Sequence, residues 1–131
     1  MPLLVETTPA NVRDDTPALA MVRRLPAVQG PRGRPRRKPK SLFGDRGYGF
    51  PWLIVQVVAM GIASFLAPRG LQHGSGLGRV RYVVEQTLAA FGQFRRIKFC
   101  YEREGRHFQA FHDLAAALIC FNRLRQVTGG L

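Results

Sequence analysis

Acidic residues are scarce in this chain of 131 residues. It holds 20 lysines and arginines against 8 aspartates and glutamates, which gives a formal net charge of +12. An excess of positive charge this large indicates a polyanionic partner, nucleic acid first and an anionic membrane surface second. The alternative is a solvated basic surface without a partner, and the clustering of the basic residues disfavours it.

Cysteine is also scarce. The two cysteines, Cys100 and Cys120, lie in apolar stretches and form no Cys-x-x-Cys pair. This spacing argues against a zinc site and against a disulfide framework, and it predicts two buried free thiols. Buried thiols are typical of a reducing compartment, and residues 1–5 are too short for the apolar core of a secretory signal. We therefore expect a cytoplasmic protein.

Charge is absent altogether from residues 50–68. An uncharged apolar run of about 18 residues is long enough to span a bilayer. However, Gly61 divides the run and Pro68 ends it, a pattern that favours a helix followed by a short buried strand. We prefer the divided interpretation and expect no membrane association, while a single span at 50–68 stays as an alternative.

The remaining pattern predicts an α/β fold in which short strands alternate with helices and the chain ends in two long helices. The first helix should start at two acids that cap it, Asp14 and Asp15, with Pro17 in its first turn. The last helix has little polar face in its middle and should be buried there. In chain order, we expect strands at 2–7, 42–43 and 63–67, and helices after Asp14, at 50–60, at 79–95 and at 107–125.

A basic Arg/Pro-rich loop occupies residues 29–40. Its prolines and glycines oppose a regular element, and its cations have no acidic residue within the loop. Such a stretch can lie along a phosphate backbone, where it supplies affinity and position rather than sequence preference. The candidate nucleic-acid contacts in this loop are Arg32, Arg34, Arg36, Arg37 and Lys38.

Two of the few acids stand at informative places. Asp45 follows a predicted strand within Gly-Asp-Arg-Gly-Tyr (44–48), and Glu85 lies on a predicted helix one turn after Arg81. Ligands of open α/β sheets bind at the carboxyl ends of strands, so a carboxylate there can meet one from a helix and hold Mg²⁺. Such ions can activate water or a 3′-hydroxyl for attack on a phosphodiester. An Arg–Glu pair one turn apart is, however, commonly a surface salt bridge.

Several motifs resemble one known family. The stretch 44–48, the run His-Gly-Ser-Gly-Leu-Gly-Arg-Val-Arg-Tyr-Val-Val-Glu-Gln-Thr (73–87), Phe-Arg-Arg-Ile (94–97) and Tyr-Glu-Arg (101–103) closely resemble the C-terminal part of bacterial insertion-sequence DDE transposases. The resemblance covers almost the whole chain. It implies a ribonuclease H-like fold whose Asp-Asp-Glu triad binds two Mg²⁺ ions, with Asp45 as the second Asp and Glu85 as the Glu. Within the same motifs, we expect His73, Arg79 and Arg81 to lie near the DNA.

The chain also departs from this family. The Tyr and Lys positions of the signature around the Glu hold Gly78 and Gly92 here, and the residue after Tyr48, often acidic in the family, is Gly49. The resemblance places the first catalytic Asp before Met1. We therefore expect a truncated ribonuclease H-like domain, residues 1–131, that binds DNA without catalysing transposition alone. Binding of Mg²⁺, the cofactor of the intact family, should be weak or absent in this fragment.

Two partner predictions and one alternative follow from these departures. An upstream transposase fragment is a possible partner that would complete the triad, and we expect no small-molecule substrate. The alternative, from another class, is a noncatalytic basic nucleic-acid-binding protein in which both acids are structural.

Overall fold

The computed structural model describes residues 1–68 and 78–129. The chain divides into two compact units, which are described separately. Residues 10–75 form the sheet unit, and residues 1–9 together with 76–131 form the helical unit.

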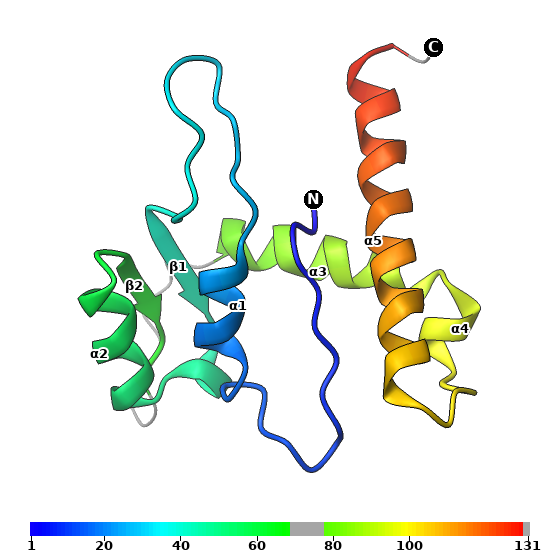
Figure 1. The fold of residues 1–131 in the computed structure, drawn as a ribbon, viewed down its shortest axis with the longest axis horizontal. Coiled ribbons are helices and arrows are strands. Elements are labelled where there is room, and N and C mark those ends of the chain that lie inside the picture. Colours follow the sequence, from blue (N-terminus) through cyan, green and yellow to red (C-terminus); the bar gives the residue numbers. More distant parts are fainter. Residues whose placement is uncertain (69–77, 130–131) are drawn as a thin grey trace. The chain divides into compact units, whose positions relative to one another are not determined.

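The sheet unit is a β-α-β arrangement preceded by one helix (Figure 1). Strands β1 and β2 pair in parallel, with Ser41 opposite Ala63 and Gly44 opposite Leu66. A parallel pair needs a crossover connection, and α2 supplies it. Pro51 occupies the first turn of α2, where its missing N–H costs nothing. The elements are α1 (Ala18–Arg24), β1 (Ser41–Gly44), the 3₁₀ helix η1 (Arg46–Tyr48), α2 (Pro51–Ala59) and β2 (Ala63–Leu66).

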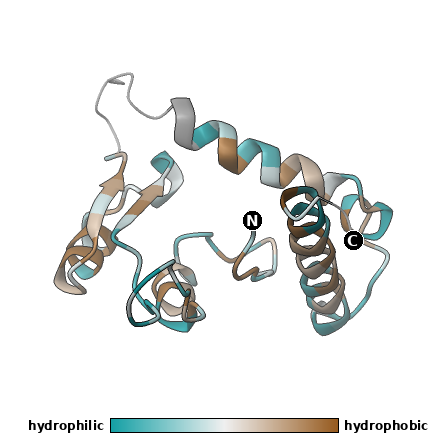
Figure 2. Ribbon diagram, turned by 90° about the horizontal axis from the view of Figure 1, so that it is seen from above, coloured by the Kyte–Doolittle hydropathy of each residue, from teal (hydrophilic) through white to brown (hydrophobic). Residues whose placement is uncertain are grey.

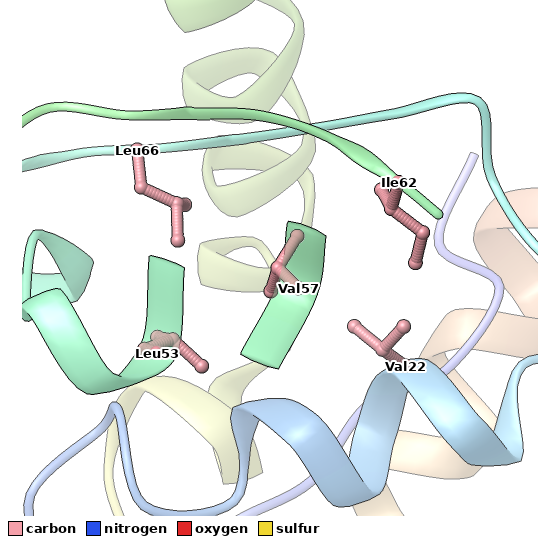
Figure 3. Close-up of a cluster of buried hydrophobic side chains, with 5 residues drawn as sticks. All are labelled: Val22, Leu53, Val57, Ile62 and Leu66. Atoms are coloured by element: carbon pink, nitrogen blue, oxygen red, sulfur yellow. The ribbon is translucent and has the colours of Figure 1, made fainter. Parts of the chain in front are cut away.

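The core of the sheet unit lies between α1, α2 and the end of β2. Figure 3 shows the five buried side chains of this cluster turned toward one another: Val22, Leu53, Val57, Ile62 and Leu66. The helix α2 is coloured apolar along most of its length, in keeping with its position against the sheet (Figure 2). Its link to β2 turns at Gly61, whose φ of 75° is a conformation that glycine adopts without strain.

The helical unit consists of α3 (Gly78–Gly92), the short α4 (Arg95–Lys98) and α5 (Gly105–Val127). Its buried cluster is small, comprising Phe91 of α3 and Ala115 and Ile119 of α5. Residues 1–9 run beside α5 without regular structure: Gln109 accepts from the Thr7 backbone N–H at 2.7 Å and donates to the Val5 carbonyl at 2.9 Å.

The α/β prediction is confirmed, and so are the strands near 42–43 and 63–67 and the helix near 50–60. The division of residues 50–68 into a helix and a strand is confirmed as well. None of the helices in the described ranges 1–68 and 78–129 is long and apolar enough to cross a membrane.

Other expectations were wrong. Residues 2–7 form no strand; the Gln109 side chain bonds the Thr7 N–H and the Val5 carbonyl, two groups that a neighbouring strand would otherwise have bonded. The helix expected at 79–95 is present as α3, but it ends at Gly92, three residues earlier than expected. The middle of α5 is buried on one side only: Ala115 and Ile119 are buried, whereas Leu114 and Leu118 are exposed. Cys100 is exposed, contrary to the prediction of two buried thiols.

The expected acidic cap of the first helix was also wrong. No side chain caps α1, whose N-cap residue is Pro17. Asp15 is instead buried, with 3% of its surface exposed, and pairs with Arg13. The carboxylate therefore neutralises an arginine rather than the helix N-terminus.

Candidate functional site

Asp45 lies where β1 ends and η1 begins. Its Oδ1 accepts a hydrogen bond from the Gly47 backbone N–H at 2.9 Å, so the side chain caps the 3₁₀ turn. Asp45 itself is exposed. The strand end thus presents a carboxylate of fixed orientation to solvent, as the sequence predicted from Gly-Asp-Arg-Gly-Tyr.

Gly44 makes this strand end possible. A Cβ at Gly44 would lie 2.6 Å from Leu66 Cδ2 and 3.3 Å from the Cβ of Tyr48. The first distance is shorter than real Cβ contacts and the second is tight, so a larger residue at position 44 would require the Leu66 side chain to move and Tyr48 to shift slightly. The close approach sets the position of the neighbouring Asp45.

Tyr48 is a feature of the site that the sequence reasoning did not single out. Burial raises the pKa of its hydroxyl above the ordinary value of 10.0, and nearby carboxylate charges raise it further. A negative charge close to a phenol opposes its ionisation, so Tyr48 stays protonated at neutral pH. Burial has the largest effect on this pKa. The carboxylate of Asp14 has the next largest effect, followed by those of Asp45 and Asp15. The spacing Asp-x-x-Tyr across a tight turn was the available signal.

Asp15 is a buried carboxylate that pairs with Arg13, an arginine whose side chain is 60% exposed. Arg13 donates from Nε to Oδ1 and from its terminal nitrogen to Oδ2, both at 2.9 Å. The Arg13 guanidinium also lies over the ring of Phe50, 4.0 Å from its centroid. The bidentate pair uses both oxygens of Asp15 and orients the Arg13 guanidinium, which in turn contacts Phe50, the residue before α2.

Glu85 lies on α3 in the helical unit. Its Oε1 is 3.7 Å from Nε of Arg81, and the two side chains are 67% and 68% exposed. An exposed pair one turn apart contributes only about 0.3–0.5 kcal/mol to stability. The ion pair therefore leaves Glu85 free to accept another partner at little cost.

Asp45 and Glu85 lie in different units, so their pairing stays a prediction. Within the residues that the structure describes, no three His, Cys, Asp or Glu side chains are grouped so as to hold a metal ion. His73 and the side chain of Arg79, two of the predicted DNA contacts, lie outside the described part of the chain.

The basic loop is more ordered than its composition suggested. Val28 and Arg36 form one antiparallel bridge, with backbone N···O distances of 2.8 and 2.9 Å, in a stretch otherwise without regular structure. All five predicted nucleic-acid contacts of this loop are exposed. The structure thus places Arg32, Arg34, Arg36, Arg37 and Lys38 together on one projecting segment of the sheet unit.

Comparison with known proteins shows the family. The sequence model of the family described as "Transposase DDE domain" matches residues 1–120. The chain therefore belongs to the family of DDE transposases. The chain is similar to a Burkholderia cepacia protein named "Putative transposase for insertion sequence element IS402", with 38% identity over 130 residues. That alignment covers 99% of this chain and 62% of the relative, so the chain spans less than two thirds of its length. No solved structure matches the chain.

Proposed function

We propose that this chain is a transposase-derived DNA-binding protein. Its parent family would move DNA by metal-dependent phosphodiester cleavage and strand transfer, and this chain alone would bind DNA without catalysing that reaction. The observation that carries the proposal is the family match along residues 1–120. The exposed cations of residues 29–40 support DNA as the partner, since such side chains bind phosphates with release of counterions.

Asp45 and Glu85 are the residues proposed to hold the metal. Carboxylate oxygens are the hard ligands that Mg²⁺ prefers, and both side chains are exposed, so the donor chemistry fits. Bound there, the ion would activate the attacking oxygen and stabilise the leaving one. Arg81 would orient the Glu85 carboxylate, and the basic loop would fix the DNA backbone.

A ribonuclease H-like architecture is part of this proposal. The parallel β1–α2–β2 unit, with a carboxylate at the end of β1, supports it. The triad's first Asp would come from an upstream transposase fragment, a separate partner chain. The cytoplasm is the compartment proposed for the encounter with DNA.

Isothermal titration of Mg²⁺ into the full chain tests the metal assignment. We expect the double variant Asp45→Asn, Glu85→Gln to weaken binding by about tenfold or more, as losses at metal sites do. Glu104→Gln is the matched control, because Glu104 also forms an exposed ion pair, with Arg106. Equal affinities in all three proteins would contradict the metal assignment, and cleavage of transposon-end DNA by the isolated chain would contradict its inactivity.

The second candidate is a noncatalytic basic nucleic-acid-binding protein. It is favoured by the fact that both acids already have local roles, Asp45 as the cap of η1 and Glu85 as the partner of Arg81. This candidate predicts that the double variant binds DNA and Mg²⁺ as the wild type does. The first candidate predicts that only DNA binding is kept.

A further inference from the structure

The segment 28–38, named here the basic hairpin, is a preformed loop rather than a shapeless tail. Figure 1 shows the chain running out after α1, turning, and returning toward β1. The Val28–Arg36 bridge closes its base. Inside the loop, Gln29 Nε2 donates to the carbonyl of Gly33 at 3.0 Å, which ties the tip to one leg. Binding therefore needs less ordering of this segment than a disordered chain would require.

The tip of the basic hairpin has a glycine at its apex and an arginine on each side of it. Its apex is Gly33, with φ of 97° and no atom within 4 Å of the position a Cβ would take. Arg32 and Arg34 flank the apex, and a proline follows on each side, Pro31 and Pro35. The apex is thus narrow, with two long cations beside it. In the described part of the chain, neither arginine side chain forms an ion pair or hydrogen bond.

We propose that Arg32 and Arg34 enter the minor groove of A·T-rich duplex DNA with Gly33 between them. This inference deepens the proposed function, because it rests on DNA being the partner. The minor groove is only about 6 Å wide, so a backbone without a side chain at its apex is suited to approach the floor. Narrow A·T tracts also carry the strongest negative potential, which attracts inserted arginines.

The floor of the groove explains the preference for A·T. A·T pairs present only acceptors there, adenine N3 and thymine O2, whereas guanine adds the N2 amino group, a donor. Guanidinium groups carry donors and no acceptor, so they match the first pattern and are opposed by the second. Duplex RNA is a poorer fit, because its minor groove is wide and shallow.

The cations at the base of the hairpin have a different role. Arg37 and Lys38 follow the Val28–Arg36 bridge and are exposed, away from the narrow tip. From there they contact the phosphates that border the groove, which adds affinity for any sequence. The two arginines at the tip of the hairpin thus recognise the base pairs, and the cations at its base position the protein on the DNA backbone.

The full chain can be titrated at low salt against three duplexes of equal length: A·T-rich, G·C-rich, and one with inosine in place of guanine. An inosine–cytosine pair keeps the major-groove pattern of G·C but lacks the amino group in the minor groove. We expect the A·T and inosine duplexes to bind about tenfold more tightly than the G·C duplex. An inosine duplex that binds like G·C, or equal binding of all three, would overturn the minor-groove assignment. Binding of none of them would instead overturn the proposed function.

Variants that conserve the net charge separate the recognition of A·T base pairs from the general electrostatic attraction to DNA. The double variant Arg32→Lys, Arg34→Lys keeps the net charge but replaces the planar, weakly hydrated guanidinium by a strongly hydrated ammonium, which enters a narrow groove less readily. It should therefore bind G·C DNA as before and show a clearly smaller preference for A·T. The double variant Arg37→Lys, Lys38→Arg is the matched control and should keep the full preference. Loss of preference in the control, or its undiminished persistence in the tip variant, would contradict the assignment of the tip.

Discussion

The two units of the chain differ in how many hydrophobic side chains they bury. In the described residues, the sheet unit buries five hydrophobic side chains and the helical unit buries three. The two long helices of the helical unit leave many apolar side chains exposed, among them Tyr82, Val84 and Leu88 of α3 and Leu114, Leu118, Phe121 and Leu124 of α5. The β-α-β unit covers one face of its sheet with its own helix and leaves Phe43 and Phe65 on the strands exposed, whereas two long helices bury only the faces where they meet. Hydrophobic periodicity therefore specifies a helix without specifying what covers it.

Removing a core side chain gives the largest expected effect. Leu53 is 1% exposed in the sheet unit, and Leu53→Ala should lower the free energy of unfolding by about 2–5 kcal/mol, because the cavity adds to the lost transfer energy. Leu114→Ala removes the same atoms from a side chain that is 58% exposed on α5, and its effect should stay within about 0.5 kcal/mol. Urea unfolding followed by circular dichroism measures both.

A large loss from Leu114→Ala would break this comparison, since it would mean that the side chain is covered. Ile119→Ala is the buried counterpart on the same helix, with 6% exposed, and it should cost about as much as other buried isoleucines, 2–5 kcal/mol. The three variants together test whether the helical unit has a core only around Phe91, Ala115 and Ile119.

Two glycines should respond to alanine with opposite signs. At Gly44 of the sheet unit, the new Cβ would meet Leu66 at 2.6 Å, and overpacking of this kind costs about 1–3 kcal/mol. At Gly92, the last residue of α3, a Cβ meets nothing within 4 Å and φ is not positive, so Ala should stabilise by about 0.4–1 kcal/mol. Thermal unfolding of the two variants beside the wild type measures the sign. A Gly44→Ala protein as stable as the wild type would contradict overpacking at this position and would show that the Leu66 side chain moves away without cost.

The sequence predicted the sheet unit well because its signals are local. The short strands, the apolar helix starting at Pro51 and the turn at Gly61 each follow from a few neighbouring residues. The prediction of a strand at 2–7 failed because the partner of this segment is far away in sequence. Gln109 accepts hydrogen bonds from both the backbone N–H and the hydroxyl of Thr7, which lies 102 residues before it. A stretch of β-branched and apolar residues carries no sign that a side chain will replace a strand.

The candidate site was predictable only in part. The position of Asp45 at a strand end followed from the motif, and the Arg81–Glu85 pair followed from helical spacing. The link between Arg13 and Asp15 was not found, because acids before a proline also fit a helix cap. The bridge that closes the basic hairpin was missed as well, since two exposed residues eight positions apart give no hydrophobic pattern. That Glu85 joins Asp45 in a metal site stays a prediction.

The smallest expected effect concerns Tyr48 and appears only at high pH. Burial and the neighbouring aspartates raise the pKa of Tyr48 in the folded state above the 10.0 of an unfolded chain. Below pH 10 both states keep the proton, so Tyr48 adds no pH dependence there. As the pH rises above 10, the unfolded state loses the proton first, and the free energy of unfolding falls until the folded pKa is passed.

Tyr48→Phe removes this titration while it keeps the ring against the core of the sheet unit. The free energy of unfolding of the variant should therefore fall less steeply than that of the wild type between pH 10 and pH 11, as measured by urea unfolding at fixed ionic strength. Asp45→Asn should give an intermediate slope, because it removes one of the charges that oppose ionisation of Tyr48. A wild-type slope in Tyr48→Phe would mean that the tyrosine is as free to ionise in the folded sheet unit as in the unfolded chain, and that Asp45 does not influence it.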